Sequence, residues 1–317
     1  MNQSPLYAAI DLGSNSFHML VVREVAGAIR TVAKVKRKVR LAAGLDADSR
    51  LSLEAMERGW DCLRLFAEQL QDVPKENTRI VGTATLRLAA NVDDFLIEAE
   101  RILGHHIEVI TGEDEAKTIY QGVSWTSSGD GKRLVIDIGG GSLEVAMGSD
   151  EDPTVALSVP AGAGRVTREF LPENGIANDR DLEDARRNIR KILEPMVKAF
   201  PKSKHPMHAV GTSKTIRSLA RLAGAVVRQP GRVDTSIMTI DQLEDWLPRL
   251  AAISPDQRTA LPGVTPERTY QIVGGGLVID EIMKALDVKE VEICPWALRE
   301  GAILRWLDQF GRTRLGF

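Results

Sequence analysis

The chain has 317 residues, enough for two domains of ordinary size, with the 43% hydrophobic and 27% charged content of a globular protein. Its formal net charge of -3 gives no global attraction for nucleic acid, so a polyanionic ligand needs locally concentrated cations. No apolar run approaches the ~20 residues of a membrane-spanning helix, and the N-terminus lacks the features of a signal peptide. We therefore expect a cytoplasmic protein that binds neither nucleic acid nor a membrane.

The first half interleaves strands and helices, which predicts an α/β fold. It opens as a β-meander, with strands over Tyr7–Leu12 and Phe17–Val22 and a third strand that reaches Arg40. Apolar residues three to four apart then predict a helix from about Leu53 to Leu70. The other elements expected here are a strand near Arg79–Thr83, a helix from about Val92 to Leu103, a strand at Ile107–Ile110 and a helix from about Asp114.

A repeat defines the domain organisation. The sequence AIDLGSNS at residues 9–16 is echoed by VIDIGGGS at 135–142, with identical Ile, Asp, Gly and Ser at matching offsets. Two copies of one strand-turn-strand unit predict two related domains. We place them at residues 1–124 and 125–297, with the boundary near the polar, Gly-rich stretch that begins at Trp125, and expect a last helix at about 298–312 to pack back on the first.

The second copy continues with a strand over Leu143–Met147. The elements expected after it are a strand near His208–Gly211 and helices at about Asp179–Phe200, Lys214–Ala223, Ile240–Leu250 and Gly276–Ala285.

Both Asp-x-Gly turns predict phosphate binding. Their small residues let backbone amides approach an anion, and Asp11 and Asp137 are hard oxygen ligands that suit Mg²⁺. Glu144 lies two residues beyond Ser142 on the returning strand and shares its face; its counterpart in the first copy is His18. A tight hairpin capped by its aspartate is the alternative for either turn alone.

Three acids at a helix start, Glu113, Asp114 and Glu115, leave two roles open. The helix dipole favours negative charge there, so capping explains one or two of them. A carboxylate facing the Asp137 turn could instead orient or deprotonate a water for attack on a terminal phosphoryl group.

Several cations are candidate phosphate contacts. Lys34, Lys36, Lys38 and Arg40 alternate along the third strand, so a period of two places them on one face. Such a row normally protects an edge strand from aggregation, although in an acidic chain it also favours polyanion binding. The further candidates, each otherwise a structural or surface cation, are Arg87, Lys214 and Arg299.

Only Cys62 and Cys294 occur, which excludes a disulfide framework and a thiolate zinc site. We expect both to be buried packing residues.

Together the motifs DLGSNSFHMLV, GTATLR, TGEDEA, DIGGGSLE, VGTSKT and PWALREG resemble the exopolyphosphatase and guanosine pentaphosphate phosphohydrolase family over essentially the whole chain. The resemblance implies two actin-like, ribonuclease-H-like domains with the active site in the cleft between them. It implies Mg²⁺-dependent (or Mn²⁺-dependent) release of orthophosphate from polyphosphate ends or from the 5′ end of guanosine pentaphosphate.

Carried over by position, the family's catalytic glutamate falls on Glu115. The residues that match its metal motif are Asp137 and Glu144, to which the repeat adds Asp11. The residues that match its phosphate contacts are Asn15, Ser16, Arg87, Gly139, Gly140, Gly141 and Ser142, and Ser14 of the same first turn is a further candidate.

The match has two departures. Asp114 stands where the family often has a first glutamate. This departure puts in doubt that Asp114 assists catalysis, and it leaves Glu115 as the base. The chain also ends near Phe317 without the C-terminal helical extension of long members, so we expect a short form with less processive action. Residues up to about Val123 look most like the guanosine pentaphosphatase branch, and the later motifs look like short actinobacterial-type exopolyphosphatases.

Two other functions fit the same fold. Actin-like kinases share paired Asp-x-Gly turns and would show acceptor-dependent ATP consumption. A non-catalytic sensor would bind guanosine alarmones without turnover. We favour the hydrolase, because TGEDEA and ALREG fit that family specifically, and expect a homodimer from base rates.

Overall fold

The computed structural model describes residues 5–25, 28–125, 131–200, 208–224, 226–227, 235–295 and 297–308. Its contacts divide the chain into a first unit, Met1–Gly122 with Leu298–Phe317, and a second unit, Val123–Ala297. Residues 126–130 of the expected boundary and 309–312 of the expected last helix lie outside the described residues. Within those residues, no helix is both long and apolar enough to cross a membrane.

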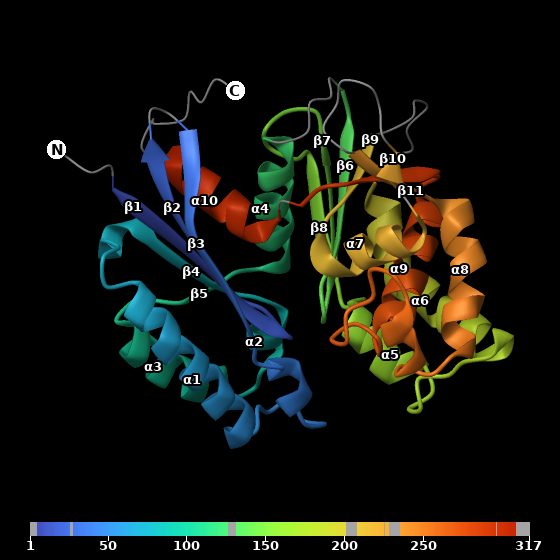
Figure 1. Cartoon of the computed structure of the whole chain (residues 1–317), viewed down its shortest axis with the longest axis horizontal. Helices are drawn as coiled ribbons and strands as arrows, with labels where there is room; N and C mark the ends of the chain where they lie inside the picture. Colours follow the sequence, from blue (N-terminus) through green and yellow to red (C-terminus); the bar gives the residue numbers. More distant parts are fainter. Residues whose placement is uncertain are drawn as a thin grey trace. The chain divides into compact units, whose positions relative to one another are not determined.

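The first unit is built on a five-stranded sheet in the order β3-β2-β1-β4-β5. Helices α1 and α3 cover one face of it, and α10 packs on the other through Ala302 and Ile303 (Figure 1). Ser52 caps α1 by accepting from the Ala55 amide, and the buried positions of α1 repeat every three to four residues. The elements are β1 (Leu6–Leu12), β2 (Ser16–Val25), β3 (Ala28–Lys38), η1 (Leu41–Gly44), α1 (Leu53–Gln69), η2 (Lys75–Asn77), β4 (Thr78–Gly82), α2 (Ala84–Leu88), α3 (Val92–Leu103), β5 (Glu108–Val109), α4 (Gly112–Ser124) and α10 (Leu298–Asp308).

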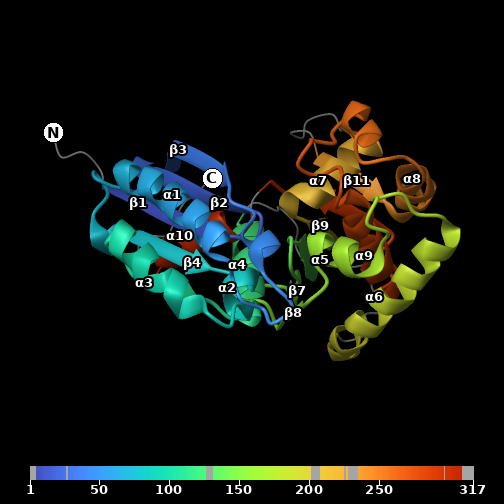
Figure 2. The same cartoon turned by 90° about the horizontal axis from the view of Figure 1, so that it is seen from below.

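The second unit has a seven-stranded sheet in the order β10-β11-β12-β9-β6-β7-β8. Helices α5 to α9 form a layer on this sheet, and α9 contacts each of the other four (Figures 1 and 2). The elements are β6 (Arg133–Ile138), β7 (Leu143–Gly148), β8 (Val155–Val159), α5 (Ala163–Phe170), α6 (Asp179–Ala199), β9 (His208–Gly211), α7 (Ser213–Leu222), β10 (Val226–Val227), β11 (Thr235–Thr239), α8 (Ile240–Ala252), η3 (Gln257–Ala260), α9 (Ile272–Ala285) and β12 (Glu290–Ile293).

The two sheets repeat one pattern. In the first unit β1 pairs antiparallel with β2 and parallel with β4; in the second, β6 pairs antiparallel with β7 and parallel with β9. The strand order β3-β2-β1-β4-β5 therefore recurs as β8-β7-β6-β9-β12. This confirms the repeated unit predicted from the two Asp-x-Gly turns.

Two expectations about local structure were wrong. β3 ends at Lys38, and Arg40 adopts a left-handed conformation (φ 53°), so Arg40 does not continue the row of cations on the strand. Helix α9 begins at Ile272, four residues before the expected Gly276. The glycines that weaken its helix propensity allow close packing, because a Cβ on Gly274 would lie 2.4 Å from Thr167 Oγ1.

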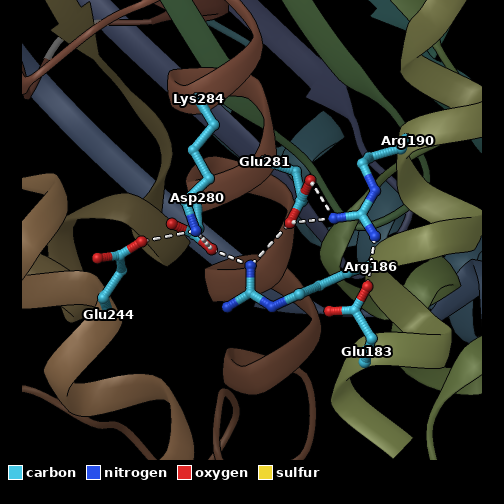
Figure 3. Close-up of polar contacts among 7 residues, drawn as sticks. All are labelled: Glu183, Arg186, Arg190, Glu244, Asp280, Glu281 and Lys284. Atoms are coloured by element: carbon cyan, nitrogen blue, oxygen red, sulfur yellow. Dashed lines mark hydrogen bonds and ion pairs between the residues drawn. The ribbon is translucent and has the colours of Figure 1, made fainter. Parts of the chain in front are cut away.

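Helix α9 also carries two buried acids (Figure 3). Asp280 and Glu281 are 0% and 3% exposed, and Arg186 of α6 donates to both, at 2.8 Å to Glu281. Burial opposes the charge of Arg186, yet its hydrogen bonds to Asp280 and Glu281 hold its pKa above the ordinary value. Outer members of the cluster are Glu183, Arg190, Glu244 and Lys284. Charges thus fix α9 to α6 and α8.

Both cysteines are buried, as expected. Burial raises the pKa of the Cys62 thiol to about 12, against a minor opposing effect of Arg37, so at neutral pH it is not a thiolate nucleophile.

Candidate active site

The glycine loop of the second unit joins β6 to β7 and is tied down from behind. The Gly139 amide donates to Ser142 O at 2.9 Å, inside the loop. The Ala163 amide donates to Gly139 O at 2.9 Å, and the Gly164 amide donates to Gly140 O at 3.0 Å. In the described part of the chain, the Gly140 and Gly141 amides donate to no backbone carbonyl. Loop amides in this state can bind an anion.

Gly162 makes this support possible. A Cβ at this position would lie 2.4 Å from the backbone nitrogens of Gly141 and Ser142. Because its φ of -72° is ordinary, space rather than backbone conformation requires glycine here. Residues at the start of α5 therefore fix the loop that follows β6.

A pair of buried carboxylates lies beside the loop. Asp137 on β6 is directly opposite Glu144 on β7, and they are 8% and 2% exposed. The Thr212 hydroxyl donates to Asp137 Oδ2, and the Ser158 hydroxyl donates to Glu144 Oε1 at 2.8 Å. Like charges directly opposite each other destabilise a strand pair, so a bound cation would stabilise this one.

The pair fits Mg²⁺, which usually takes one or two protein carboxylates and completes its shell with water and phosphate oxygens. Among the residues that the structure describes, no group of three or more His, Cys, Asp or Glu side chains could hold a metal ion. A site with two protein carboxylates is therefore what the second unit offers.

Arg268 also belongs to this region, and the sequence did not reveal it. Its Nη1 donates to Thr215 Oγ1 at 2.9 Å. Burial lowers the pKa of Arg268, and the Glu267 and Asp137 carboxylates oppose that effect. Its Nε is buried and has no hydrogen-bond partner within the described ranges. Arg268 lies in the irregular segment before α9, outside every recognisable motif, so no sequence signal marked it.

The VGTSKT motif forms the end of β9 and the start of α7. The Thr212 amide donates to Ile136 O at 2.9 Å, which places the Thr212 hydroxyl on Asp137. Ser213 has a φ of 67°, an uncommon conformation that clusters at binding sites. Lys214 is in the first turn of α7, half-buried.

The first unit holds the matching loop between β1 and β2. Ser14 and Ser16 are buried, and the Asn15 carbonyl accepts from the Val39 and Arg40 amides at 3.1 and 2.9 Å. In both units, then, the segment after the third strand holds the carbonyls of the Asp-x-Gly turn.

Asp11 is opposite His18, as Asp137 is opposite Glu144. His18 Nδ1 lies 3.3 Å from Asp11 Oδ2. A residue that can carry positive charge thus faces Asp11, where an acid faces Asp137.

The three acids of α4 have different surroundings. Glu113 pairs with Lys117 at 2.6 Å on the surface, and Asp114 accepts from the Thr111 hydroxyl at 2.7 Å at the helix start. Glu115 is 8% exposed and accepts from Arg87 Nη1 at 2.7 Å. Surface pairing and capping therefore explain the first two acids, and Glu115 is the buried one.

Two predicted phosphate contacts of the first unit pair with acids. Arg87, at the end of α2, donates to Ile110 O at 3.1 Å as well as to Glu115. Arg299 is near the start of α10, and its Nη2 lies 3.9 Å from Glu300 Oε1. The structure brings Arg87 and Glu115 together in the first unit, and Asp137, Glu144 and the glycine loop together in the second.

The repeated sheet, with a small-residue loop after the first strand of each copy, defines an actin-like fold. A family model described as Ppx/GppA phosphatase family matches residues 20–310, and the chain belongs to this family.

Curated relatives include the guanosine-5'-triphosphate,3'-diphosphate pyrophosphatases of Aeromonas hydrophila, 48% identical over 303 residues, and Vibrio campbellii, 43% identical over 306. Each match covers 96% of this chain, which spans 60% of the relative's length.

Solved structures show the same fold. An exopolyphosphatase from Cytophaga hutchinsonii superimposes with a TM-score of 0.85 at 24% identity, over 96% of this chain and 98% of the other. An Aquifex aeolicus PPX-GPPA enzyme superimposes with a TM-score of 0.78 at 24% identity, over 95% of this chain and 99% of the other.

Proposed function

We propose that this protein is a Mg²⁺-dependent phosphohydrolase that releases terminal orthophosphate from inorganic polyphosphate or from the 5′ end of guanosine pentaphosphate. The buried pair Asp137 and Glu144, beside the glycine loop, carries this proposal. Among the described residues, the Gly140 and Gly141 amides of that loop donate to no backbone carbonyl. Family membership and the names of the curated relatives support it.

In the second unit, the Gly140, Gly141 and Ser142 amides bind the terminal phosphoryl group. Asp137 and Glu144 hold the Mg²⁺, or Mn²⁺, and Thr212 keeps Asp137 oriented by its hydrogen bond. The bound metal supplies neutralisation of charge on the phosphate oxygens. Arg268 and Lys214 add positive charge, and fixed charges of this kind stabilise a phosphoryl-transfer transition state.

In the first unit, Glu115 orients or deprotonates the attacking water. Arg87 holds its carboxylate in one position by the 2.7 Å hydrogen bond and is itself held by the Ile110 carbonyl. Arg87 is thus a positioning residue for Glu115, and its other guanidinium nitrogens can contact phosphate. The loop at Ser14, Asn15 and Ser16 gives further phosphate contacts, and Arg299 is a candidate for another.

Asp11 is a weaker candidate for metal binding, because His18 already lies against its carboxylate. We also propose a cytoplasmic location and a homodimer, with no nucleic acid or membrane as partner. The chain's charge of -3 agrees with the absence of nucleic acid.

The test is phosphate release from short polyphosphate, long polyphosphate, guanosine pentaphosphate and ATP, side by side with Mg²⁺. Release from any of the first three, lost on chelation of Mg²⁺, supports the proposal and ranks the substrates. Turnover of ATP alone, and only with an acceptor, would support a kinase. Ligand binding without release from any of the four would support a sensor.

A further inference from the structure

A second anion-binding feature lies in the first unit, where β3 ends. A surface depression of about 470 Å³ opens there. Its lining residues are Lys38, Val39, Arg40, Ala43, Gly44, Ser52, Glu54 and Arg58. Three cations thus surround it with one acid, in a chain whose net charge is negative.

One wall of the depression is fixed by Arg58. Its Nε donates to Val39 O at 3.0 Å, and its Nη1 donates to Glu54 Oε1 at 2.8 Å. The one acid of the lining is therefore already paired with Arg58. A guanidinium held in this way loses little side-chain entropy when an anion binds.

The other two cations are available to a ligand. Lys38 and Arg40 are exposed, and neither side chain makes an ion pair or a hydrogen bond in the part of the chain that the structure describes. Lys34, earlier on β3, already has an acidic partner, because its Nζ lies 3.5 Å from Glu300 Oε1. The left-handed backbone of Arg40 (φ 53°, ψ 47°) is uncommon for a non-glycine residue and places it at the depression rather than on the strand.

The depression is directly attached to the predicted phosphate loop of the first unit. The Val39 and Arg40 amides both donate to Asn15 O, and the Ala42 amide donates to Ser14 O at 3.0 Å. The same short segment therefore forms the wall of the depression and the support of the loop. A phosphate chain that extends from the loop toward this segment would reach Lys38 and Arg40.

We propose that Lys38 and Arg40, with Arg58 as a fixed wall, form an accessory subsite for a linear oligophosphate, separate from the residues that act on the terminal phosphate. The subsite would hold a part of the chain that is not being cleaved. Arginine binds phosphate oxygens in pairs and lysine binds them as a point charge. The identification of polyphosphate as the source of the chain rests on the proposed function.

The test uses the full chain with Glu115→Gln, so that the ligand is not consumed. Binding of long polyphosphate is measured by calorimetry at several salt concentrations, with and without Lys38→Gln and Arg40→Gln. We expect the double substitution to weaken binding about tenfold and to reduce its salt dependence, since phosphate contacts by cations release counterions. Binding of tripolyphosphate and guanosine tetraphosphate, which have few phosphate groups beyond the terminal one, should weaken much less.

Arg180→Gln with Lys191→Gln on α6 is the matched control, because both side chains are exposed and the same two charges are removed. Equal weakening in the control, or no weakening by the double substitution, would overturn the subsite. An equal loss of single-stranded RNA binding would also overturn it, because the site would then recognise any phosphate backbone.

This experiment separates the two proposals. If the unsubstituted chain releases phosphate from no substrate while the double substitution still weakens polyphosphate binding, the subsite stands and the proposed function fails. If phosphate is released and binding of long polyphosphate is unaffected, the subsite fails alone.

Discussion

The two Asp-x-Gly turns have one architecture and different chemistry. In each, the amides of the segment after the third strand hold the carbonyls of the turn. In the second unit, however, two buried acids face each other across β6 and β7, whereas in the first unit Asp11 faces His18. The acid pair gains from a cation, and the Asp11 and His18 pair does not need one.

This difference shows how two copies of one structural unit can carry different chemical groups. In the proposed function, the second copy holds the metal through Asp137 and Glu144 and the phosphate through the amides of its loop. The first copy has a buried carboxylate on α4 and a cationic depression lined by the segment that supports its loop. Substitutions at Glu115, Asp137, Glu144, Asp11 and Gly162 test that difference, whereas those in the α9 cluster and the labelling of Cys62 test the fold that supports it.

The largest effect is expected from Glu115→Gln in the first unit. Loss of a general base lowers turnover about 10² to 10⁴-fold, while glutamine can still accept from Arg87, so the unfolding temperature should hold. Steady-state phosphate release and thermal unfolding measure both. Glu113→Gln, on the same helix but on the surface, is the matched control and should act like the unsubstituted chain. A Glu115→Gln protein with near-normal turnover would refute the assignment.

The acid pair should bind the metal more strongly than its counterpart. Asp137→Asn or Glu144→Gln should weaken metal binding by at least about 10-fold to 100-fold, the loss that is typical even for groups that only orient a metal ligand. Asp11→Asn should change it much less. Mn²⁺ binding followed by electron paramagnetic resonance gives the three affinities. Equal losses for Asp11 and Asp137 would show that both turns hold the ion.

Support of the glycine loop can be tested by Gly162→Ala. The new methyl would overlap the backbone of Gly141 and Ser142, so phosphate affinity and turnover should fall about tenfold or more. Gly44→Ala is the matched change in the first unit, because its Cβ would lie 2.2 Å from Ala55 Cβ. It should cost about 1–3 kcal/mol of stability by overpacking and leave affinity for Mn²⁺ unchanged. A Gly162→Ala protein with full turnover would contradict the role given to this support.

The charge cluster around α9 should affect stability rather than chemistry. Arg186→Met leaves Asp280 and Glu281 buried without their main partner, which should cost about 3 kcal/mol of unfolding free energy. Lys198→Met removes a surface partner of Glu194 and should have no measurable effect. Urea unfolding of both variants checks this. Similar urea midpoints for the two variants would mean that the cluster does not contribute to the free energy of unfolding.

The smallest effect is expected when the folded chain is treated with a thiol reagent, because Cys62 should scarcely react. With its pKa raised to about 12 by burial, Cys62 should react with a disulfide reagent at pH 8 only after unfolding. A fast reaction of the folded chain at Cys62 would show that α1 does not cover this residue as described.

Sequence patterns predicted most of the fold because each long element carries its own periodic signal. The helix expected from about Val92 to Leu103 has those bounds, and α1 ends one residue before the expected Leu70. The short α2 and α5 gave no such signal, since five and eight residues span too few turns. The start of α9 was missed because its glycines serve contacts with other helices, which local propensity does not encode.

Motifs allowed the sequence to single out Asp137, Glu144 and Glu115, and the structure buries all three. Their roles in the site stay predictions. Arg268 and the α9 cluster were missed, because their partners lie about 50 to 95 residues away along the chain. The left-handed turn at Arg40 depends on hydrogen bonds to Asn15, which a strand pattern cannot reveal.

The most direct test of the central claim is phosphate release in H₂¹⁸O, with guanosine pentaphosphate and with short polyphosphate, in the presence and absence of Mg²⁺. We expect that release requires Mg²⁺ and that each released phosphate carries one ¹⁸O atom from the attacking water. Release that persists after the metal is chelated, or phosphate passed to an acceptor without ¹⁸O, would contradict it.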